Sequence, residues 1–170
     1  MYEEVHRLSW ALLRFERARN RYVEVQREQF DPEEAWIPLT EALCWAVSVN
    51  EGLEEGVGEG YREASKEDED SQHMLGLIFA RNRGGHQRAL TIAVADGLSF
   101  PISFPLPFAR IVWRPADEIR QGRSNVGRNE YSARLQGNRV DQSLESVRRW
   151  FMRAHERWPS ELTNVTWPSG

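Results

Sequence analysis

The chain has one cysteine and no long apolar run, and each scarcity excludes a class of protein. Its single cysteine, Cys44, cannot form an internal disulfide, and metal sites built on several thiolates are excluded. Cys44 lies in the apolar run 42–47, so we expect a buried thiol in a reducing cytoplasm. No run approaches the roughly 20 apolar residues that span a bilayer, and residues 1–10 lack the features of a signal peptide. We therefore expect a soluble cytoplasmic protein with no membrane partner.

Lysine is also almost absent, because Lys66 is the only lysine among the 22 basic residues. Residues 1–70 hold 8 basic and 18 acidic side chains, whereas residues 71–170 hold 14 basic and 8 acidic ones. Guanidinium groups bind phosphate oxygens in pairs, so a basic second half is compatible with an RNA partner. A genome rich in G and C would produce the same preference for arginine without any such function.

The length of 170 residues, with 40% apolar residues and seven tryptophans, suits one compact domain with a hydrophobic core. We expect this domain over residues 1–158. An irregular C-terminal tail should follow over residues 159–170, with Trp167 docking on the domain.

Four segments have the apolar pattern of helices. The first shows steps of three and four residues between apolar positions, and the second is apolar on nearly all sides, which predicts a central helix in a bundle. The third should begin in an acidic cluster, whose charge suits a helix N-terminus. The expected ranges are 3–29, 33–54, from about 67 to 95, and 141–158.

The boundaries of the second helix carry their own signals. Asp31 can cap it and Pro32 can occupy its first position, while Pro38 predicts either a later start or a kink. The acidic, glycine-rich segment 52–70 predicts a solvated and mobile connection that Tyr61 pins to the domain.

Residues 97–113 change to a period of two, in which aromatic and aliphatic residues alternate with serine and proline. Because the prolines cannot donate ladder hydrogen bonds, we expect an edge strand, a short hairpin or an apolar strap. Residues 114–130 have the composition of a polar loop. The predicted fold class is mainly α: a bundle of about four helices with an extended proline and aromatic insertion, about 97–130, between the third and last helices.

The segment 81-RNRGGH-86 places two adjacent glycines in a helical context, where each costs roughly 1 kcal/mol relative to alanine. In a straight helix, Arg81 and His86 would lie about 140° apart around the axis. A turn, a helix junction or the close approach of another backbone at Gly84 and Gly85 would bring them together. Alternatively, the glycines leave room for a neighbouring helix or a substrate phosphate.

The chain has an arginine, an asparagine directly after it and, four residues after the asparagine, a histidine. In an all-helical domain, this pattern resembles the signature of the HEPN superfamily of ribonucleases and toxins. Arg81, Asn82 and His86 match this signature, within the third expected helix. The segments 79-FARNRGGHQ-87 and 113-WRPADEI-119 also resemble an uncharacterised actinobacterial protein family, which implies no function.

The HEPN resemblance implies RNA cleavage without a metal or cofactor, at an interface where two protomers bring their motifs together. The ribose 2′-hydroxyl would attack the adjacent phosphate, with His86 moving a proton and Arg81 stabilising the charge on the phosphorane oxygens. Asn82 would orient an oxygen, and Arg83 and Arg88 would bind flanking phosphates. The resemblance further implies a toxin or antiphage-defence effector with an antitoxin or other protein partner.

Two other interpretations stay open. The motif residues can form a structural polar cluster, or the chain can be a catalytically inactive relative of the family. The protein can also be a non-catalytic interaction or scaffold protein whose segment 98–113 binds a partner, provided that this segment is exposed rather than packed on the core.

Overall fold

The computed structural model describes residues 2–28, 32–87, 90–95, 110–120, 122 and 125–168. Within them the chain is mainly helical, with six α-helices, one π-helical turn and a two-stranded sheet. In chain order the elements are α1 (Tyr2–Glu28), α2 (Pro32–Val57), α3 (Glu59–Glu67), α4 (Glu69–Gln87), β1 (Ile92–Ala95), β2 (Arg110–Trp113), α5 (Arg128–Glu130), the π-turn η1 (Tyr131–Leu135) and α6 (Val140–Arg157).

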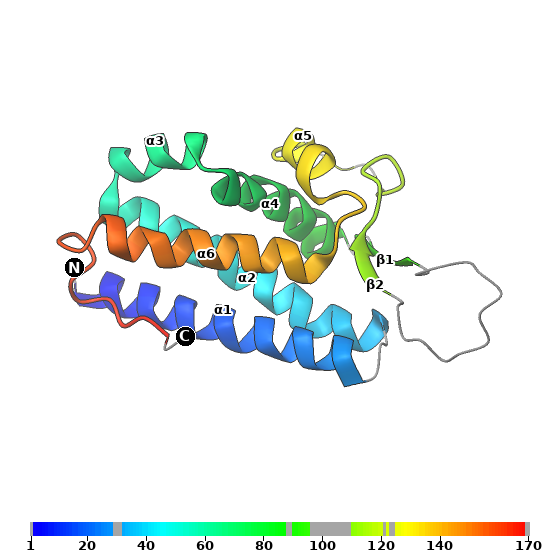
Figure 1. Cartoon of the computed structure of the whole chain (residues 1–170), viewed down its shortest axis with the longest axis horizontal. Helices are drawn as coiled ribbons and strands as arrows, with labels where there is room; N and C mark the ends of the chain where they lie inside the picture. The colour runs from blue at the N-terminus through cyan, green and yellow to red at the C-terminus, as the bar shows by residue number, and fades with distance from the viewer. Residues whose placement is uncertain are drawn as a thin grey trace.

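The four longest helices, α1, α2, α4 and α6, run side by side along the long axis of the molecule, and the core lies between them (Figure 1). The short helix α3 lies at one end of this arrangement, and the sheet lies at the other (Figure 1). The prediction of about four helices undercounts the helical segments, because it misses α3, α5 and η1.

Helix α1 confirms the first amphipathic prediction. Its apolar side chains at three- and four-residue steps, including Leu8, Leu12 and Phe15, are at most 4% exposed. The Phe15 ring meets the Phe151 ring of α6 edge to face, with 5.6 Å between centroids. The apolar stripe of α1 thus packs on both α2 and α6.

Helix α2 begins at Pro32, as predicted, and continues through Pro38, so the alternative of a later start is wrong. It packs against α1, α3, α4 and α6 but leaves one face open to solvent. Ile37 on this face is 61% exposed, and Cys44, two turns further on, is exposed as well. The prediction of a buried thiol is therefore wrong, because an apolar run does not reveal which side of a helix its neighbours cover.

The connection expected over residues 52–70 is instead helical over most of its length. Helix α2 extends to Val57, and α3 follows after Gly58. Tyr61 pins α3 as predicted: it is 2% exposed, and its hydroxyl donates to Asn50 Oδ1 at 2.8 Å. Burial of this one aromatic ring holds an otherwise acidic helix on the bundle.

Helix α4 begins inside the predicted acidic cluster. Asp68 Oδ1 accepts hydrogen bonds from the backbone N–H groups of Asp70 and Ser71, at 2.9 and 3.0 Å, which caps the helix. The Arg153 guanidinium on α6 donates to both oxygens of Asp68 at 2.8 Å and to Asp70 at 2.9 Å. Arg149 donates to the other Asp70 oxygen at 2.7 Å. This arginine–aspartate network ties the start of α4 to α6.

Replacement of Asp70 by Asn should lower the free energy of unfolding at neutral pH by about 1–2 kcal/mol. Burial alone would raise the pKa of Asp70, but hydrogen bonds from Arg149 and Arg153 outweigh it and hold the pKa below its ordinary value of 3.8. The folded state therefore binds this proton less readily than the unfolded state. The stability that the Asp70 carboxylate contributes is fully present above its ordinary pKa. This stability is lost as the pH falls through and below that value.

Urea denaturation of wild type and Asp70→Asn from pH 7 down to pH 3 measures this dependence. The difference between the two proteins should shrink at the acid end. The isosteric control Glu63→Gln removes an exposed pair with Lys66 and should change nothing measurable. A difference between wild type and Asp70→Asn that stays constant with pH would contradict the assignment.

Residues 92–95 form a strand, so the prediction of helix up to residue 95 is wrong. Strand β1 pairs antiparallel with β2, and Ile92 lies opposite Trp113. The β-branched residues Thr91, Ile92 and Val94 favour strand over helix, and the sheet partner they require lies far along the chain. Residues 110–113 are therefore extended as predicted, and their partner strand lies outside the segment expected to be extended. The rest of the extended prediction, 97–109, lies outside the described residues.

The segment expected as a polar loop, 114–130, ends in α5, and η1 follows without a break. Tyr131 of η1 is fully buried, and its hydroxyl donates to the carbonyl of Arg114 at 2.8 Å. The Trp113 indole N–H donates to Ser143 Oγ of α6 at 3.0 Å. These contacts attach the sheet and η1 to the end of the bundle.

Helix α6 confirms the last predicted helix almost to the residue, and its apolar side, from Leu144 to Ala154, is at most 1% exposed. The chain then turns back along α1, with Leu162 and Val165 buried. Trp167 stacks on His155 at 4.8 Å between ring centroids, which confirms its predicted docking. The hydrophobic core therefore extends beyond residue 158.

No helix in the described ranges combines the length and the apolar character needed to cross a membrane.

Candidate functional site

Arg81 and Asn82 lie in the C-terminal part of α4, near the end of the bundle where the sheet packs. Both side chains are half-buried, and the Arg81 guanidinium donates to Asn82 Oδ1 at 3.0 Å. Arg81 forms no ion pair with a carboxylate of the described residues, so none of these carboxylates neutralises its charge. The helix is the fourth in chain order rather than the third, because α3 precedes it.

The adjacent glycines do not break α4. The helix runs through Gly84 and Gly85 and ends at Gln87, so the predicted turn or junction between Arg81 and His86 is wrong. His86 is helical in its backbone, and its side chain lies outside the described part of the structure. In a continuous helix, positions 81 and 86 point about 140° apart and are offset by about 7.5 Å along the axis. A continuous α4 therefore places these two positions on different sides of the helix.

Arg83 has a structural position that the RNA-binding prediction did not anticipate. It is 1% exposed, lies over the Phe79 ring at 4.9 Å, and donates to Asn125 Oδ1 at 2.9 Å. Burial lowers the pKa of this guanidinium, and the nearby charge of Arg128 lowers it further. In this conformation Arg83 holds the segment before α5 against α4 and does not face a phosphate in solution.

The segment before α5 meets the α4 backbone at very short range. Gly127 has φ +74°, and a Cβ atom there would lie 1.9 Å from the carbonyl oxygen of Leu75. Sequence reasoning missed both Asn125 and Gly127 as parts of this site. The signal was present in the turn-forming sequence Asn125-Val126-Gly127, but nothing in it identified α4 as the neighbour.

The other predicted RNA-binding residue, Arg88, lies outside the described residues. The same holds for residues 98–109 of the segment predicted to bind a protein partner. In the remainder of that segment, Ile111 and Trp113 are fully buried in β2.

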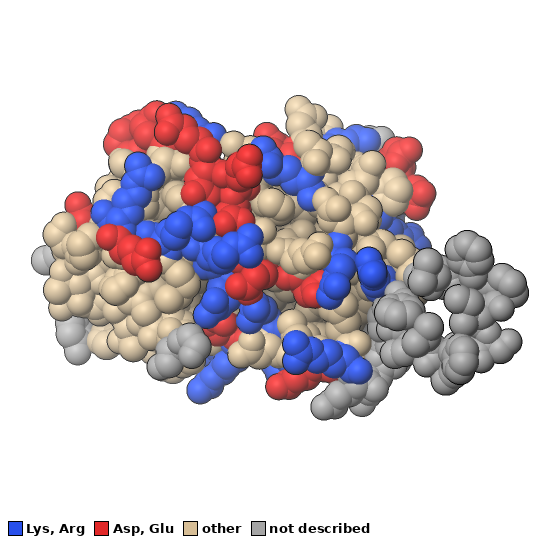
Figure 2. Space-filling model, in the orientation of Figure 1, with Lys and Arg blue, Asp and Glu red and all other residues tan. Residues whose placement is uncertain are grey.

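The basic second half of the sequence does not form a uniformly basic surface. Many arginines of α6 alternate with carboxylates on the face shown in Figure 2. Arg148 donates to Glu16 of α1 at 2.7 Å, and Arg149 and Arg153 bind the aspartates at the start of α4. The arginines of α6 therefore serve mainly to join helices, and their number is not a measure of affinity for RNA.

No protein-family model matches the chain, and no curated protein or solved structure shows significant similarity to it. The resemblance to the HEPN superfamily therefore depends on the residues Arg81, Asn82 and His86 and on their helical setting.

Proposed function

We propose that the protein is a metal-independent endoribonuclease of the HEPN type that acts as a homodimer. The observation that carries this proposal is the environment of Arg81. Its half-buried guanidinium is bound to the neutral amide of Asn82 and to no carboxylate of the described chain. A structural polar cluster would pair such an arginine with an acid, whereas a phosphate-binding arginine keeps its charge available.

The proposed reaction is attack of a ribose 2′-hydroxyl on the adjacent phosphorus, which expels the 5′-oxygen of the next nucleotide. Arg81 stabilises the negative charge that develops on the phosphorane oxygens, and Asn82 orients one of them. His86 takes the proton from the 2′-hydroxyl or returns one to the leaving oxygen, because imidazole titrates near neutral pH. No cofactor takes part in this reaction.

The geometry of α4 supports the dimeric form of this proposal. Since positions 81 and 86 diverge on a continuous helix, a second protomer is needed to complete one site from both groups. Arg88 remains a candidate contact for flanking phosphates. We assign Arg83 to positioning, because its hydrogen bond to Asn125 orients the segment packed against the motif. In this proposal the protein is a toxin or antiphage effector that an antitoxin or another protein restrains.

Single replacements Arg81→Ala and His86→Ala should each reduce the rate of RNA cleavage by about 100-fold or more. The assay uses purified protein, labelled single-stranded and structured RNA, and excess chelator, so that metal-dependent cleavage is suppressed. Matched controls are Arg17→Ala, an exposed arginine of α1, and His73→Ala, a half-buried histidine of α4 itself. Both controls should keep wild-type activity, and all four variants should retain the wild-type circular dichroism spectrum.

Equal cleavage by wild type and an Arg81→Ala/His86→Ala double variant would refute the proposal. A particle that light scattering shows to be monomeric at assay concentration would also count against it. A folded wild type that cleaves none of the RNAs would leave the alternative of a non-catalytic interaction protein.

A further inference from the structure

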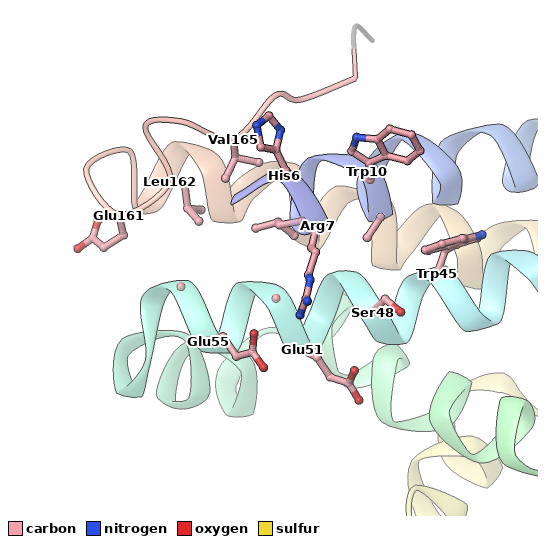
Figure 3. A pocket seen from close by; sticks show the side chains of 14 residues that line it. His6, Arg7, Trp10, Trp45, Ser48, Glu51, Glu55, Glu161, Leu162 and Val165 are labelled. Atoms are coloured by element: carbon pink, nitrogen blue, oxygen red, sulfur yellow. The ribbon is translucent and has the colours of Figure 1, made fainter. Parts of the chain in front are cut away.

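A groove of about 1160 Å³ lies between the N-terminal half of α1 and the C-terminal half of α2, and the C-terminal segment closes one side (Figure 3). The ends of α1 and α2 that line it lie at the end of the bundle that carries α3, whereas the C-terminal end of α4, which contains Arg81, lies near the sheet at the opposite end (Figure 1). The groove is larger than the 300–1,000 Å³ typical of small-molecule pockets. A volume of this size can hold part of a polypeptide segment.

Two tryptophans form the apolar end of this groove. Trp10 of α1 is 59% exposed, and Trp45 of α2 is half-buried, so each presents part of its indole ring to solvent. An exposed tryptophan beside a hollow offers a large apolar surface with few rotatable bonds, which makes such residues frequent anchors in protein interfaces. The core does not need the Trp10 ring, since the ring lies outside it.

The rest of the groove has an acidic rim. Glu51 and Glu55 lie one turn apart on α2, and Glu161 lies on the C-terminal segment; all three are exposed (Figure 3). Arg7 of α1 projects toward Glu51 and is the one arginine among the described lining residues. With His6 neutral, the described lining has a net charge of −2. This charge repels phosphate groups and attracts cations.

We propose that this groove binds a basic amphipathic helix of a partner protein. An apolar side chain of that helix packs between Trp10 and Trp45, and its lysines or arginines face Glu51 and Glu55. Those carboxylates lie about 9 and 15 Å beyond Trp45 along α2. Basic side chains four residues apart on an incoming helix have the spacing of the two glutamates.

The charge distribution also decides between occupants. A nucleic acid would place its phosphate groups next to three carboxylates, and the like charges would repel each other. A second copy that bound through the same surface would place the two acidic rims against each other across a two-fold axis. A basic helix meets neither obstacle. This proposal goes beyond the ribonuclease proposal and does not depend on it, because the groove and Arg81 are at opposite ends of the bundle.

The test uses three fluorescein-labelled synthetic peptides of about 18 residues, or five helical turns. The first is an amphipathic helix of leucine, alanine and lysine with lysines at four-residue spacing. In the second every lysine is replaced by glutamate, and the third scrambles the first so that no apolar face remains. Fluorescence anisotropy with the full-length protein should show that the lysine helix binds at least about tenfold more tightly than either of the others.

Variants then locate the binding. Trp10→Ala should weaken binding of the lysine helix by about tenfold or more, and Glu51→Gln/Glu55→Gln should weaken it by about fivefold and reduce its salt dependence. Ile37→Ala and Glu34→Gln are control substitutions on α2 outside the groove. Both variants should bind the lysine helix as tightly as wild type does. All variants should keep the RNA cleavage rate of wild type, which separates this result from the ribonuclease test.

Comparable affinity for the lysine and glutamate helices would overturn the proposal, as would the absence of binding at about 1 mM protein. Unchanged affinity in Trp10→Ala and in the double glutamine variant would do the same. If Trp10→Ala converts a dimer into a monomer in light scattering, the groove is an interface between copies of this chain, and the partner-helix proposal is wrong.

Discussion

Trp150→Ala should lower the free energy of unfolding by about 3–5 kcal/mol, one of the largest effects we expect from a single substitution in this protein. Trp150 lies on α6 and is 1% exposed. Its ring lies 5.2 Å from the Tyr61 ring and 6.3 Å from the Trp158 ring, and its N–H donates to the Tyr61 hydroxyl at 2.7 Å. Truncation leaves a cavity where α2, α3 and α6 meet and removes a hydrogen bond from a buried hydroxyl.

Trp10→Ala is the matched control, because it deletes the same side chain at a position that is 59% exposed. We expect it to cost less than about 1 kcal/mol. Trp150→Phe keeps most of the apolar contact and removes the N–H donor, so it should cost about 1–2 kcal/mol. Urea denaturation followed by far-ultraviolet circular dichroism measures all three. Equal losses for Trp150→Ala and Trp10→Ala would contradict the burial of Trp150.

Gly127→Ala should destabilise the protein by about 3 kcal/mol and loosen the segment that packs on the candidate site. Two costs combine at this position. The backbone has φ +74°, which an L-amino acid with a Cβ atom rarely adopts, and that atom would lie 1.9 Å from the Leu75 carbonyl oxygen. The obstacle is backbone inside α4, which cannot move aside as a flexible side chain would.

Gly137→Ala separates these two costs. Gly137 has the same φ of +74°, but a Cβ atom there would meet nothing within 4 Å. Gly137→Ala should therefore lower the free energy of unfolding by only about 1 kcal/mol, which is the conformational cost without the steric one. Urea denaturation compares the two variants, and hydrogen exchange of residues 125–135 should increase in Gly127→Ala alone. Similar losses of stability in both variants would show that the close approach to α4 is not a constraint.

Gly127→Ala also connects the fold to the proposed activity. The shift it forces would disturb Asn125, which accepts a hydrogen bond from Arg83, the residue that directly follows the Arg81–Asn82 pair. If the ribonuclease proposal is correct, RNA cleavage should fall in this variant and stay normal in Gly137→Ala. Cleavage that falls equally in both would indicate a loss of folded protein rather than a local effect.

Local patterns predicted the long helices well, because the three- and four-residue repeat of apolar side chains reports directly on which face is buried. The predicted ranges for α1 and α6 agree with the structure to within one residue at each end that it describes. The acidic start of α4 was also predictable, since a carboxylate at Asp68 caps the helix through neighbouring N–H groups. These features depend on residues close together in sequence.

Errors occurred where a distant contact decides the outcome. Helix α3 forms in an acidic, glycine-rich segment because Tyr61 is held by Asn50 and Trp150. Residues 92–95 leave the helical pattern because 110–113 pair with them. Arg83 resembled a surface cation in the sequence, yet Asn125, 42 residues away, holds it inside the protein.

The sequence by itself determined that the chain is helical, where its longest helices lie, and that arginine, asparagine and histidine occur together near the end of one of them. Only the tertiary structure decided that α4 continues through Gly84 and Gly85, that Arg81 donates to an amide and to no carboxylate of the described chain, and that α6 arginines pair with acids. The physical reason is that helix formation follows from local side-chain periodicity, whereas burial and charge pairing depend on which helices become neighbours.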